Sequence, residues 1–363
     1  MASTRRAFCA TAGIGIATAW LNSRGCEASQ ADERDADASE PAAELNMPRI
    51  DVHAHLGGDT TAIANFLDLR RRMIETHNAD LAMYIDLGSR KVQAPDQHRS
   101  LEASGGRVLT CIADYSPHDG PAHRPEDLAQ RMEEGYIGYK IWAGPHSRRL
   151  KDGQGVYRYI DDPMHVETFA ELERLGMVAA SIHIADPNGP FGNRTRWLPD
   201  PVEYWREINA WRNVLVRHPG LNAVAAHANW LICQDAQLDY LRYMLAAFPK
   251  LNVDLAATFQ YFYLLDRDNL RDFMIQWADR ILFGTDVSAL ANEQAVAQCV
   301  ERYRRCFRML ETDELVEGGF FGMNESRGLA LPRDVLEKIY YRNAARIYPR
   351  VRQQLTQLGY AVD

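Results

Sequence analysis

The sequence predicts an α/β fold of the (β/α)8 TIM-barrel class over residues 48–363. From residue 48 onward, eight short apolar runs alternate with amphipathic stretches of helical length. The apolar runs carry aliphatic or β-branched residues on both faces, as parallel strands covered by helices do. No second break in composition divides this stretch, which favours a closed barrel over a doubly wound open sheet.

Composition and charge exclude several classes of protein. The chain has 363 residues, 46% of them hydrophobic, and a formal net charge of -8. It lacks the basic surface that supplies most of the affinity for nucleic acid, so no nucleic-acid partner is expected. No uninterrupted apolar run reaches about 18 residues, so no stable membrane span is expected either. A small-molecule substrate is the partner that remains, and homo-oligomerisation stays open.

The N-terminal segment is expected to direct export and not to join the fold. Arg5 and Arg6 precede a short apolar stretch that is too short to span a membrane, and residues 1–28 resemble a twin-arginine signal peptide. This resemblance predicts recognition by the twin-arginine export machinery and a periplasmic or extracellular location. Residues 29–47, rich in Ala, Ser, Asp and Glu, are expected to be a disordered acidic linker. A disordered basic N-terminus, or a lipid anchor at Cys26, is the alternative.

The eight expected strands are the apolar runs Arg49–Ala54, Leu81–Leu87, Arg107–Ala113, Ile137–Trp142, Met177–Ile184, Ala223–His227, Leu251–Ala256 and Ile281–Thr285. The expected helices are the amphipathic stretches between and after them: Ala62–Thr76, Pro125–Glu134, Met164–Leu175, Pro201–Arg217, Gln234–Phe248, Leu270–Ala278 and Asn292–Leu310. The tail 332–360 is expected to be helical and to pack on the outside. Two long connections, 88–106 and 186–199, are expected as loops over the C-terminal mouth of the barrel, where such loops build active sites.

The first strand carries the strongest chemical signal. Alternate residues of a strand share a face, so Asp51, His53 and His55 are expected to point into the barrel. The residues between them are expected to face the helices: Ile50, Val52 and Ala54. His53 and His55 lie about 7 Å apart along the strand, and their imidazoles can converge on one cation.

Three further polar residues end other predicted strands. His183 lies at the end of strand five, His227 ends strand six and Asp286 comes just after strand eight. Each of them alone has a structural explanation, as a buried histidine bonded to a carbonyl or an aspartate that caps a helix. So many buried polar groups at strand ends are unfavourable without a partner, and a metal ion satisfies them together.

The remaining histidines and the cysteines have ordinary explanations. Seven histidines are expected as solvated residues in loops or at helix ends: His77, His98, His118, His123, His146, His165 and His218. Only His146 among them is placed to reach the mouth of the barrel. Four cysteines occur singly, without disulfide or metal-ligand spacing, and are expected as small core residues: Cys111, Cys233, Cys299 and Cys306.

Taken together, the motifs VHAHLG, GYKIWAG, SIHIADP, AAHANWL, ILFGTDVS and YYRNAARIYP resemble the amidohydrolase superfamily. The resemblance covers residues 48–348 and is to the amidohydrolase-related (amidohydrolase 2) branch, which includes lactone hydrolases and aminocarboxymuconate-semialdehyde decarboxylase-like enzymes. It implies a divalent metal, one Zn²⁺ per chain, held by four ligands: His53, His55, His183 and Asp286. It also implies that His227 acts on the substrate.

Substrate-binding residues are expected at three further positions. Lys140 ends the fourth strand, either as a cation at the barrel mouth beside a single metal or as a carboxylated lysine that bridges two. Arg194 and Arg196 lie on the long loop after strand five and are expected either to bind a substrate carboxylate or to lie on the surface. The segment 258–265, TFQYFYLL, is either a hydrophobic substrate wall or core packing.

These residues predict a metal-dependent hydrolase of a small ester, lactone or amide. A divalent metal lowers the pKa of a bound water to about 7, which supplies a hydroxide nucleophile at neutral pH. Asp286 is expected to accept the water proton and pass it to the leaving group, while His227 stabilises the oxyanion. A non-oxidative decarboxylase of a small unsaturated or aromatic carboxylate is the alternative. A non-catalytic binding protein on the same barrel is the third possibility.

Overall fold

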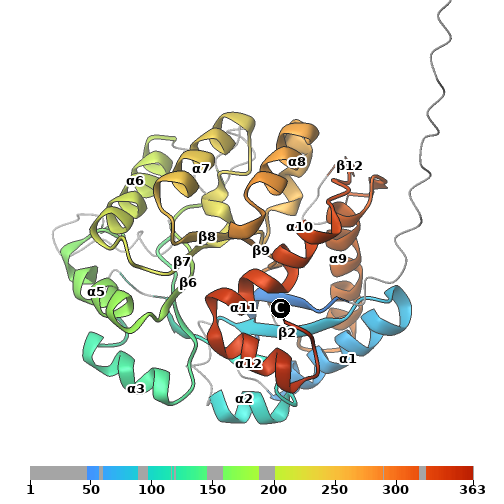
Figure 1. The fold of residues 1–363 in the computed structure, drawn as a ribbon, viewed down its shortest axis with the longest axis horizontal. Coiled ribbons are helices and arrows are strands. Elements are labelled where there is room, and N and C mark those ends of the chain that lie inside the picture. The colour runs from blue at the N-terminus through green and yellow to red at the C-terminus, as the bar shows by residue number, and fades with distance from the viewer. Residues whose placement is uncertain are drawn as a thin grey trace, which may run out of the picture. The chain divides into compact units, whose positions relative to one another are not determined.

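Parallel strands form the centre of the fold and helices surround them (Figure 1). The computed structural model describes residues 47–56, 60–88, 97–115, 117, 120–144, 158–187, 201–288, 290–318 and 324–362. The predicted signal peptide, nearly all of the predicted linker, and Arg194 and Arg196 lie outside these residues, so the export prediction stays a prediction. No helix in the described part of the chain has the length and apolar character that crossing a bilayer requires.

The strands of the barrel are β1 (Arg49–His55), β2 (Leu81–Asp86), β3 (Val108–Thr110), β4 (Ile112–Asp114), β5 (Gly138–Ile141), β6 (Val178–Ile182), β7 (Ala223–Ala225), β8 (Leu251–Asp254), β9 (Ile281–Leu282) and β10 (Val287–Ser288). They form one sheet in the order β10-β1-β2-β3 and a second in the order β4-β5-β6-β7-β8-β9, and every pair in both sheets is parallel.

The two sheets join at two interrupted strands, and the joins close the ring. Only Cys111 separates β3, which pairs with β2, from β4, which pairs with β5. In the same way β9 pairs with β8, and β10 pairs with β1. At the second join the Val52 amide donates to the Phe283 carbonyl at 3.0 Å. Each interrupted pair counts as one strand of the barrel, so the predicted eight-stranded parallel barrel is confirmed.

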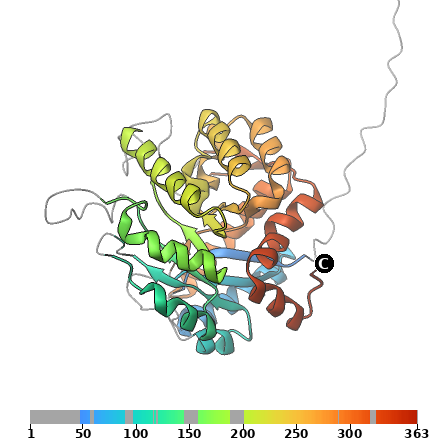
Figure 2. The ribbon, with the colours of Figure 1, turned by 60° about the vertical axis from the view of Figure 1, so that its left-hand side comes forward.

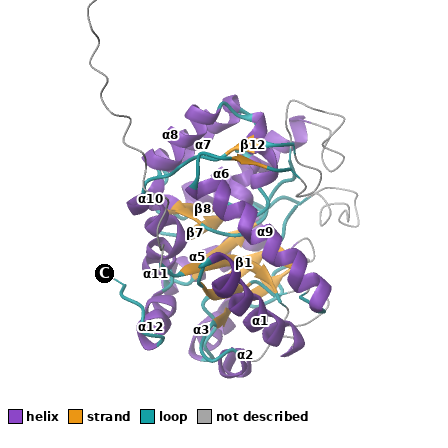
Figure 3. Cartoon of the chain, turned by 90° about the vertical axis from the view of Figure 1, so that its right-hand side faces the viewer, coloured by secondary structure: helices purple, strands orange, loops and turns teal. Residues whose placement is uncertain are grey.

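The helices cover the outside of this ring (Figures 2 and 3). They are α1 (Thr60–His77), α2 (Gln97–Ala103), α3 (Leu128–Glu133), α5 (Val166–Leu175), α6 (Pro201–Arg217), α7 (Asp235–Ala247), α8 (Arg267–Gln276), α9 (Glu293–Glu311), α10 (Arg333–Glu337), α11 (Asn343–Ile347) and α12 (Pro349–Gln357). Short 3-10 or π turns join several of them: η2 (Pro125–Asp127), η3 (Pro163–His165), η4 (Ala226–Trp230), η5 (Phe259–Leu264), η6 (Ala278–Arg280) and η7 (Lys338–Arg342). The sequence did not predict the small antiparallel hairpin of β11 (Leu315–Val316) and β12 (Ser326–Arg327).

Some predicted boundaries were wrong for local reasons. The stretch expected as a loop between the second and third strands contains α2. Helix α8 begins three residues earlier than predicted because the Asp266 side chain caps it, accepting from the Asn269 amide at 2.9 Å. The C-terminal helical tail is divided at Tyr348, whose extended backbone precedes Pro349 at the start of α12.

A bulge in β1 corrects the predicted facing of its residues. The register of β1 against β2 shifts between Asp51 and Ala54. Asp51 therefore points outward, where its carboxylate accepts hydrogen bonds of 2.5 Å from Thr285 Oγ1 and from Tyr303 on α9. Val52 takes the inward direction instead. Since an extra residue in a strand reverses the alternation beyond it, His53 and His55 still reach the barrel interior.

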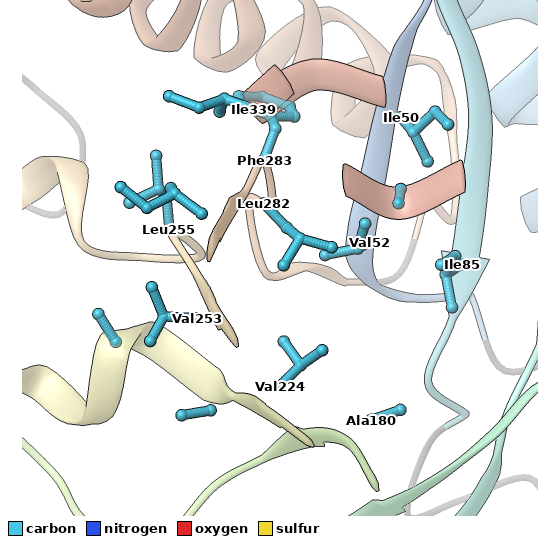
Figure 4. Packing of buried hydrophobic residues seen from close by; sticks show 14 of the residues in the cluster. Ile50, Val52, Ile85, Ala180, Val224, Val253, Leu255, Leu282, Phe283 and Ile339 are labelled. Atoms are coloured by element: carbon cyan, nitrogen blue, oxygen red, sulfur yellow. The ribbon is translucent and has the colours of Figure 1, made fainter. Parts of the chain in front are cut away.

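Apolar side chains fill the barrel beneath its C-terminal end. Val52, Ile85, Val224 and Leu282 come from four strands and gather between them in Figure 4, and all four are fully buried. The four cysteines of the barrel domain are free and buried, as predicted.

Two histidines that were predicted to lie on the surface are buried. His165 is 3% exposed, and His218 is 7% exposed beside Phe169 and Glu173. Both rings pack against or next to α5, so these two histidines belong to the buried layer between the helices and the barrel. Sequence reasoning had no signal for this, because neither residue lies in an apolar run.

We expect the burial of His165 to make the protein sensitive to acid. Burial lowers the pKa of His165 to about 4, whereas an unfolded histidine titrates near 6.5. The folded-state pKa is the lower one, so the stability that neutral His165 contributes is complete above pH 6.5 and is lost as pH falls toward 4. The loss amounts to about 3 kcal/mol of unfolding free energy. Urea unfolding should measure the free energy of unfolding of the wild type and of His165→Gln at pH 7 and at pH 4. The difference between the two proteins should be about 3 kcal/mol smaller at pH 4 than at pH 7. A constant difference would contradict the prediction.

Candidate active site

A cavity of about 290 Å³ opens at the C-terminal ends of the barrel strands. Its lining consists almost entirely of polar and aromatic side chains: His53, His55, Tyr115, Lys140, Trp142, His183, His227 and Asp286. The structure therefore brings together every predicted site residue that lies in its described part. A concave site with several convergent polar groups, placed at this end of a barrel, has the character of an active site.

One group of ligand atoms comes from strands one and eight. His53 and His55 end β1, and Asp286 lies between β9 and β10 in a left-handed backbone conformation with φ 60°. The Asp286 carboxylate is 3.1 Å from Nε2 of His55 and 3.5 Å from Nε2 of His53. All three ligand atoms lie within 4.8 Å of one another.

Hydrogen bonds prepare both of these imidazoles to bind a metal. Nδ1 of His53 is 3.0 Å from the Asp254 carboxylate, and Nδ1 of His55 is 2.8 Å from the Gly88 carbonyl. Both partners only accept, so the neutral form of each ring carries its proton on Nδ1 and offers a lone pair at Nε2 to a metal. Two imidazole nitrogens and a carboxylate are a donor set that suits Zn²⁺, and these residues fit a divalent metal.

The other two histidines form a second pair. Nδ1 of His183 faces Nε2 of His227 at 3.1 Å. The opposite nitrogens have acceptors of their own, because His183 Nε2 is 3.3 Å from Asp186 and His227 Nδ1 is 2.8 Å from the Ala256 carbonyl. If both rings are neutral, two lone pairs face each other, an arrangement that a proton or a cation between them stabilises. His183 does not belong to the group of His53, His55 and Asp286, so its predicted role as a ligand of that metal stays a prediction.

His227 lies in a strained turn. The predicted sixth strand ends earlier than expected, at Ala225, and four consecutive residues from His227 to Trp230 have φ between 48° and 58°. Left-handed backbone costs about 1 kcal/mol or more per non-glycine residue. Trp230 stabilises the turn by stacking on the His227 ring at 4.3 Å and by donating from Nε1 to the Ala185 carbonyl at 2.7 Å. The turn thereby fixes the direction of the His227 imidazole.

Lys140 contributes a buried cation to the cavity. It is 1% exposed, and Nζ donates to the Ser181 carbonyl at 2.5 Å. Burial lowers the pKa of Lys140 to about 8. A substantial fraction of the amine is therefore neutral only slightly above physiological pH.

Electrostatics set the charge of the other groups. Burial lowers the pKa of His53 to about 4, although Asp254 attracts its proton. Burial and the adjacent His183 and His53 rings hold the pKa of His227 well below its ordinary value. Burial opposes ionisation of Asp286, but the imidazoles of His55 and His53 outweigh it and keep its pKa below the ordinary range. At neutral pH His53 and His227 are thus neutral and the Asp286 carboxylate is ionised.

Other sequence hypotheses have mixed outcomes. Arg194, Arg196 and His146 lie outside the described residues, and their roles stay predictions. Phe259 and Phe262 in the segment 258–265 are buried and pack on each other, and no residue of that segment lines the described part of the cavity. Phe259 and Phe262 are therefore core residues, and the substrate-wall alternative for the rest of the segment stays a prediction.

Sequence reasoning missed Asp254. It ends β8, is fully buried, and touches both His53 and His227. A charged residue inside the predicted apolar strand Leu251–Ala256 was the available signal.

Gly144 shows how closely the cavity wall packs on His183. A Cβ at this position would lie 2.9 Å from Cδ2 and 3.0 Å from Nε2 of the His183 ring. We expect Gly144→Ala to displace the ring and to lower kcat/KM about tenfold to hundredfold, with little change in Tm. Gly105→Ala is the matched control. Its Cβ meets nothing within 4 Å, but its φ of 61° strains alanine, so it should lower Tm and leave kcat/KM unchanged. Wild-type kcat/KM for Gly144→Ala would show that the His183 orientation is not needed.

Comparison with solved structures finds several distant matches. An uncharacterized TIM-barrel protein from Bordetella bronchiseptica is 15% identical, with a TM-score of 0.51, and the match covers 84% of this chain and 99% of that one. Amidohydrolase 2 from Bifidobacterium longum subsp. infantis is 12% identical, with a TM-score of 0.47 over 84% of this chain and 99% of its own. For 4-oxalomesaconate hydratase from Rhodopseudomonas palustris the identity is 12% and the TM-score 0.44, over 86% and 98% of the two chains.

At these identities the likeness to the Bordetella protein shows the fold alone. No curated protein matches the chain. The sequence profile of the amidohydrolase family, however, matches residues 140–350, which is more than half of the chain. This protein belongs to the amidohydrolase family.

Proposed function

We propose that the protein is a metal-dependent hydrolase that cleaves a small ester, lactone or amide. The observation that carries the proposal is the convergence of His53, His55 and Asp286 within 4.8 Å at the wall of a 290 Å³ cavity. Family membership supports an enzymatic function that depends on a divalent metal. The cavity volume is that of a site for a small molecule.

His53, His55 and Asp286 would hold the metal. A divalent metal, when bound, supplies Lewis-acid chemistry, which polarises a carbonyl and makes water acidic enough to ionise near neutral pH. Asp286 is ionised and its side chain is 37% exposed, so its carboxylate can take a proton from water in the cavity. The same carboxylate then returns the proton to the leaving group.

His227 acts beside the group that would hold the metal, with its ring centroid 4.9 Å from that of His53. Its Nδ1 proton is held by the Ala256 carbonyl, so the neutral ring presents a lone pair at Nε2. In this tautomer His227 first accepts a proton and can then donate a hydrogen bond to an oxyanion. Lys140 lines the same cavity, and its ammonium form attracts a carbonyl oxygen or a carboxylate of the substrate.

We further propose one Zn²⁺ per chain, with Lys140 as an uncarboxylated amine. The wall of the cavity supports this, because one group of two imidazoles and a carboxylate there is enough to hold one Zn²⁺. The facing nitrogens of His183 and His227 are where a second ion would bind if Lys140 were carboxylated. Two metal ions per chain, falling to one in Lys140→Met, would favour that alternative.

Product analysis in labelled water tests the reaction class. The purified protein, assayed for metal, is incubated in H₂¹⁸O with lactones, aryl esters, anilides and unsaturated carboxylates. We expect one ¹⁸O atom in the acid product of a lactone, ester or amide. Release of CO₂ without ¹⁸O in the other product would establish the decarboxylase instead. Full metal content without turnover of any substrate class would favour a binding protein.

A further inference from the structure

Three buried aspartates repeat one arrangement around the barrel. In each, a single carboxylate oxygen accepts the backbone N–H two residues ahead and a second N–H from a neighbouring strand end. Asp51 accepts from His53 and Thr285 at 2.9 and 3.2 Å, and Asp86 accepts from Gly88 and Leu56 at 2.9 and 3.0 Å. Asp254 accepts from Ala256 and His227 at 3.1 and 2.9 Å. Each aspartate thus fixes the backbone at or beside a candidate site residue.

Asp254 differs from Asp51 in the partners of its second oxygen. Asp254 Oδ2 is 3.0 Å from Nδ1 of His53 and accepts from Ser181 Oγ at 2.8 Å. In Asp51 the second oxygen accepts from the hydroxyls of Thr285 and Tyr303. A hydroxyl can either donate to its partner or accept from it. A neutral imidazole has a single N–H, so a ring that accepts at Nδ1 must carry its proton on Nε2.

The four hydrogen bonds of Asp254 leave its carboxylate no free position for a metal ion. A carboxylate has about four acceptor positions, and the neighbours of Asp254 use all of them. Asp254 is fully buried, so these four contacts at 2.8–3.1 Å take up both of its oxygens. An oxygen of Asp254 lies within 4.8 Å of nitrogens of His53 and His227. Because its acceptor positions are used by hydrogen bonds to these and other neighbours, Asp254 orients the two histidines and does not itself bind the metal.

We propose that Asp254 is a positioning residue that sets the protonation of His53 and the backbone of His227 at once. By accepting from Nδ1, it keeps Nε2 of His53 free to bind a metal, as carboxylates do for metal-bound histidines. By accepting from the His227 amide, it stabilises the first residue of the left-handed turn. This inference rests on the proposed metal site and does not depend on which bond the enzyme cleaves.

Asp254→Asn tests the proposal with little change in shape. The asparagine oxygen can still accept from the amides of Ala256 and His227, but its NH₂ then faces Nδ1 of His53. His53 must accept there and carry its proton on Nε2. We expect the Zn²⁺ dissociation constant of the metal-free protein, measured by competition with a chromophoric chelator, to rise about 10- to 100-fold.

Asp51→Asn is the matched control. It keeps both amide contacts, and its NH₂ meets hydroxyls that can accept, so the Zn²⁺ dissociation constant should stay within about threefold of the wild type. Equal effects of the two substitutions, or an unchanged affinity in Asp254→Asn, would reduce Asp254 to a structural residue.

A measurement on the wild type covers the case in which Asp254→Asn does not fold. In ¹⁵N-histidine NMR of the metal-free protein, His53 should carry its proton on Nδ1 and not on Nε2. The opposite tautomer would overturn the proposal. The Zn²⁺ dissociation constant and the His53 tautomer test the role of Asp254 whether or not the enzyme is a hydrolase. The ¹⁸O experiment tests only the reaction class, so the two proposals can fail independently.

Discussion

The double variant His53→Ala/His55→Ala is expected to purify without the divalent metal and to lose activity at least about a thousandfold. The change removes both imidazole donors and leaves Asp286 as the remaining member of the group within 4.8 Å. One carboxylate does not hold Zn²⁺ against water, whereas a site needs three or four protein ligands. Loss of the metal removes several kcal/mol of transition-state stabilisation, and about 4 kcal/mol corresponds to the thousandfold loss.

Metal analysis, steady-state kinetics and thermal unfolding measure this outcome. The appropriate reference for stability is the metal-free wild type, because a bound ion stabilises the native state by mass action. His77→Ala is the control, since His77 is exposed at the end of α1 and should change neither metal content nor kcat/KM. If the double variant retains about one metal per chain, these histidines are not the ligands.

His227→Asn should keep its metal and lose about 2 to 4 kcal/mol of transition-state stabilisation, a fall in kcat of about 30- to 1000-fold. The neutral Nε2 faces His183 at 3.1 Å and lines the cavity, and the His227 ring centroid is 4.9 Å from that of His53 in the group that would hold the metal. Asparagine has a similar volume near the Cβ but cannot take up the proton. KM should change less than kcat, because the interaction is made in the transition state.

Metal content decides between roles for His227. A variant that retains the wild-type metal content with low kcat supports action on the substrate. If one of two ions is lost, the facing nitrogens of His183 and His227 hold a second metal. If all metal is lost, His227 is a ligand of the first site. Unchanged kcat would remove His227 from the mechanism altogether.

The barrel was predictable because parallel strands must be apolar on both faces. The polar residues at their ends followed from the same pattern, and His53, His55, His227 and Asp286 do line one cavity. The direction of Asp51 was not predictable, because the bulge that reverses it depends on pairing with β2 and not on the local sequence. The left-handed turn after β7 was hidden for a similar reason. His227 and Asn229 tolerate positive φ better than most residues, but AHANW has no glycine and does not predict four such residues in a row. The contacts of Trp230 and Asp254 that stabilise the turn come from distant parts of the chain.

Closure of the ring has a consequence for the order of folding. Thr285 and Asp51 are 234 residues apart in the chain, and their hydrogen bond forms only when the last strand docks on the first. Contacts this distant in sequence form late, because the entropy of closing the loop opposes them. The proposed metal ligands lie on these same two strands, so a folding chain gains its binding site only at the final step. Metal capture during refolding is therefore a kinetic marker of barrel closure, and it should lag behind the formation of helical structure.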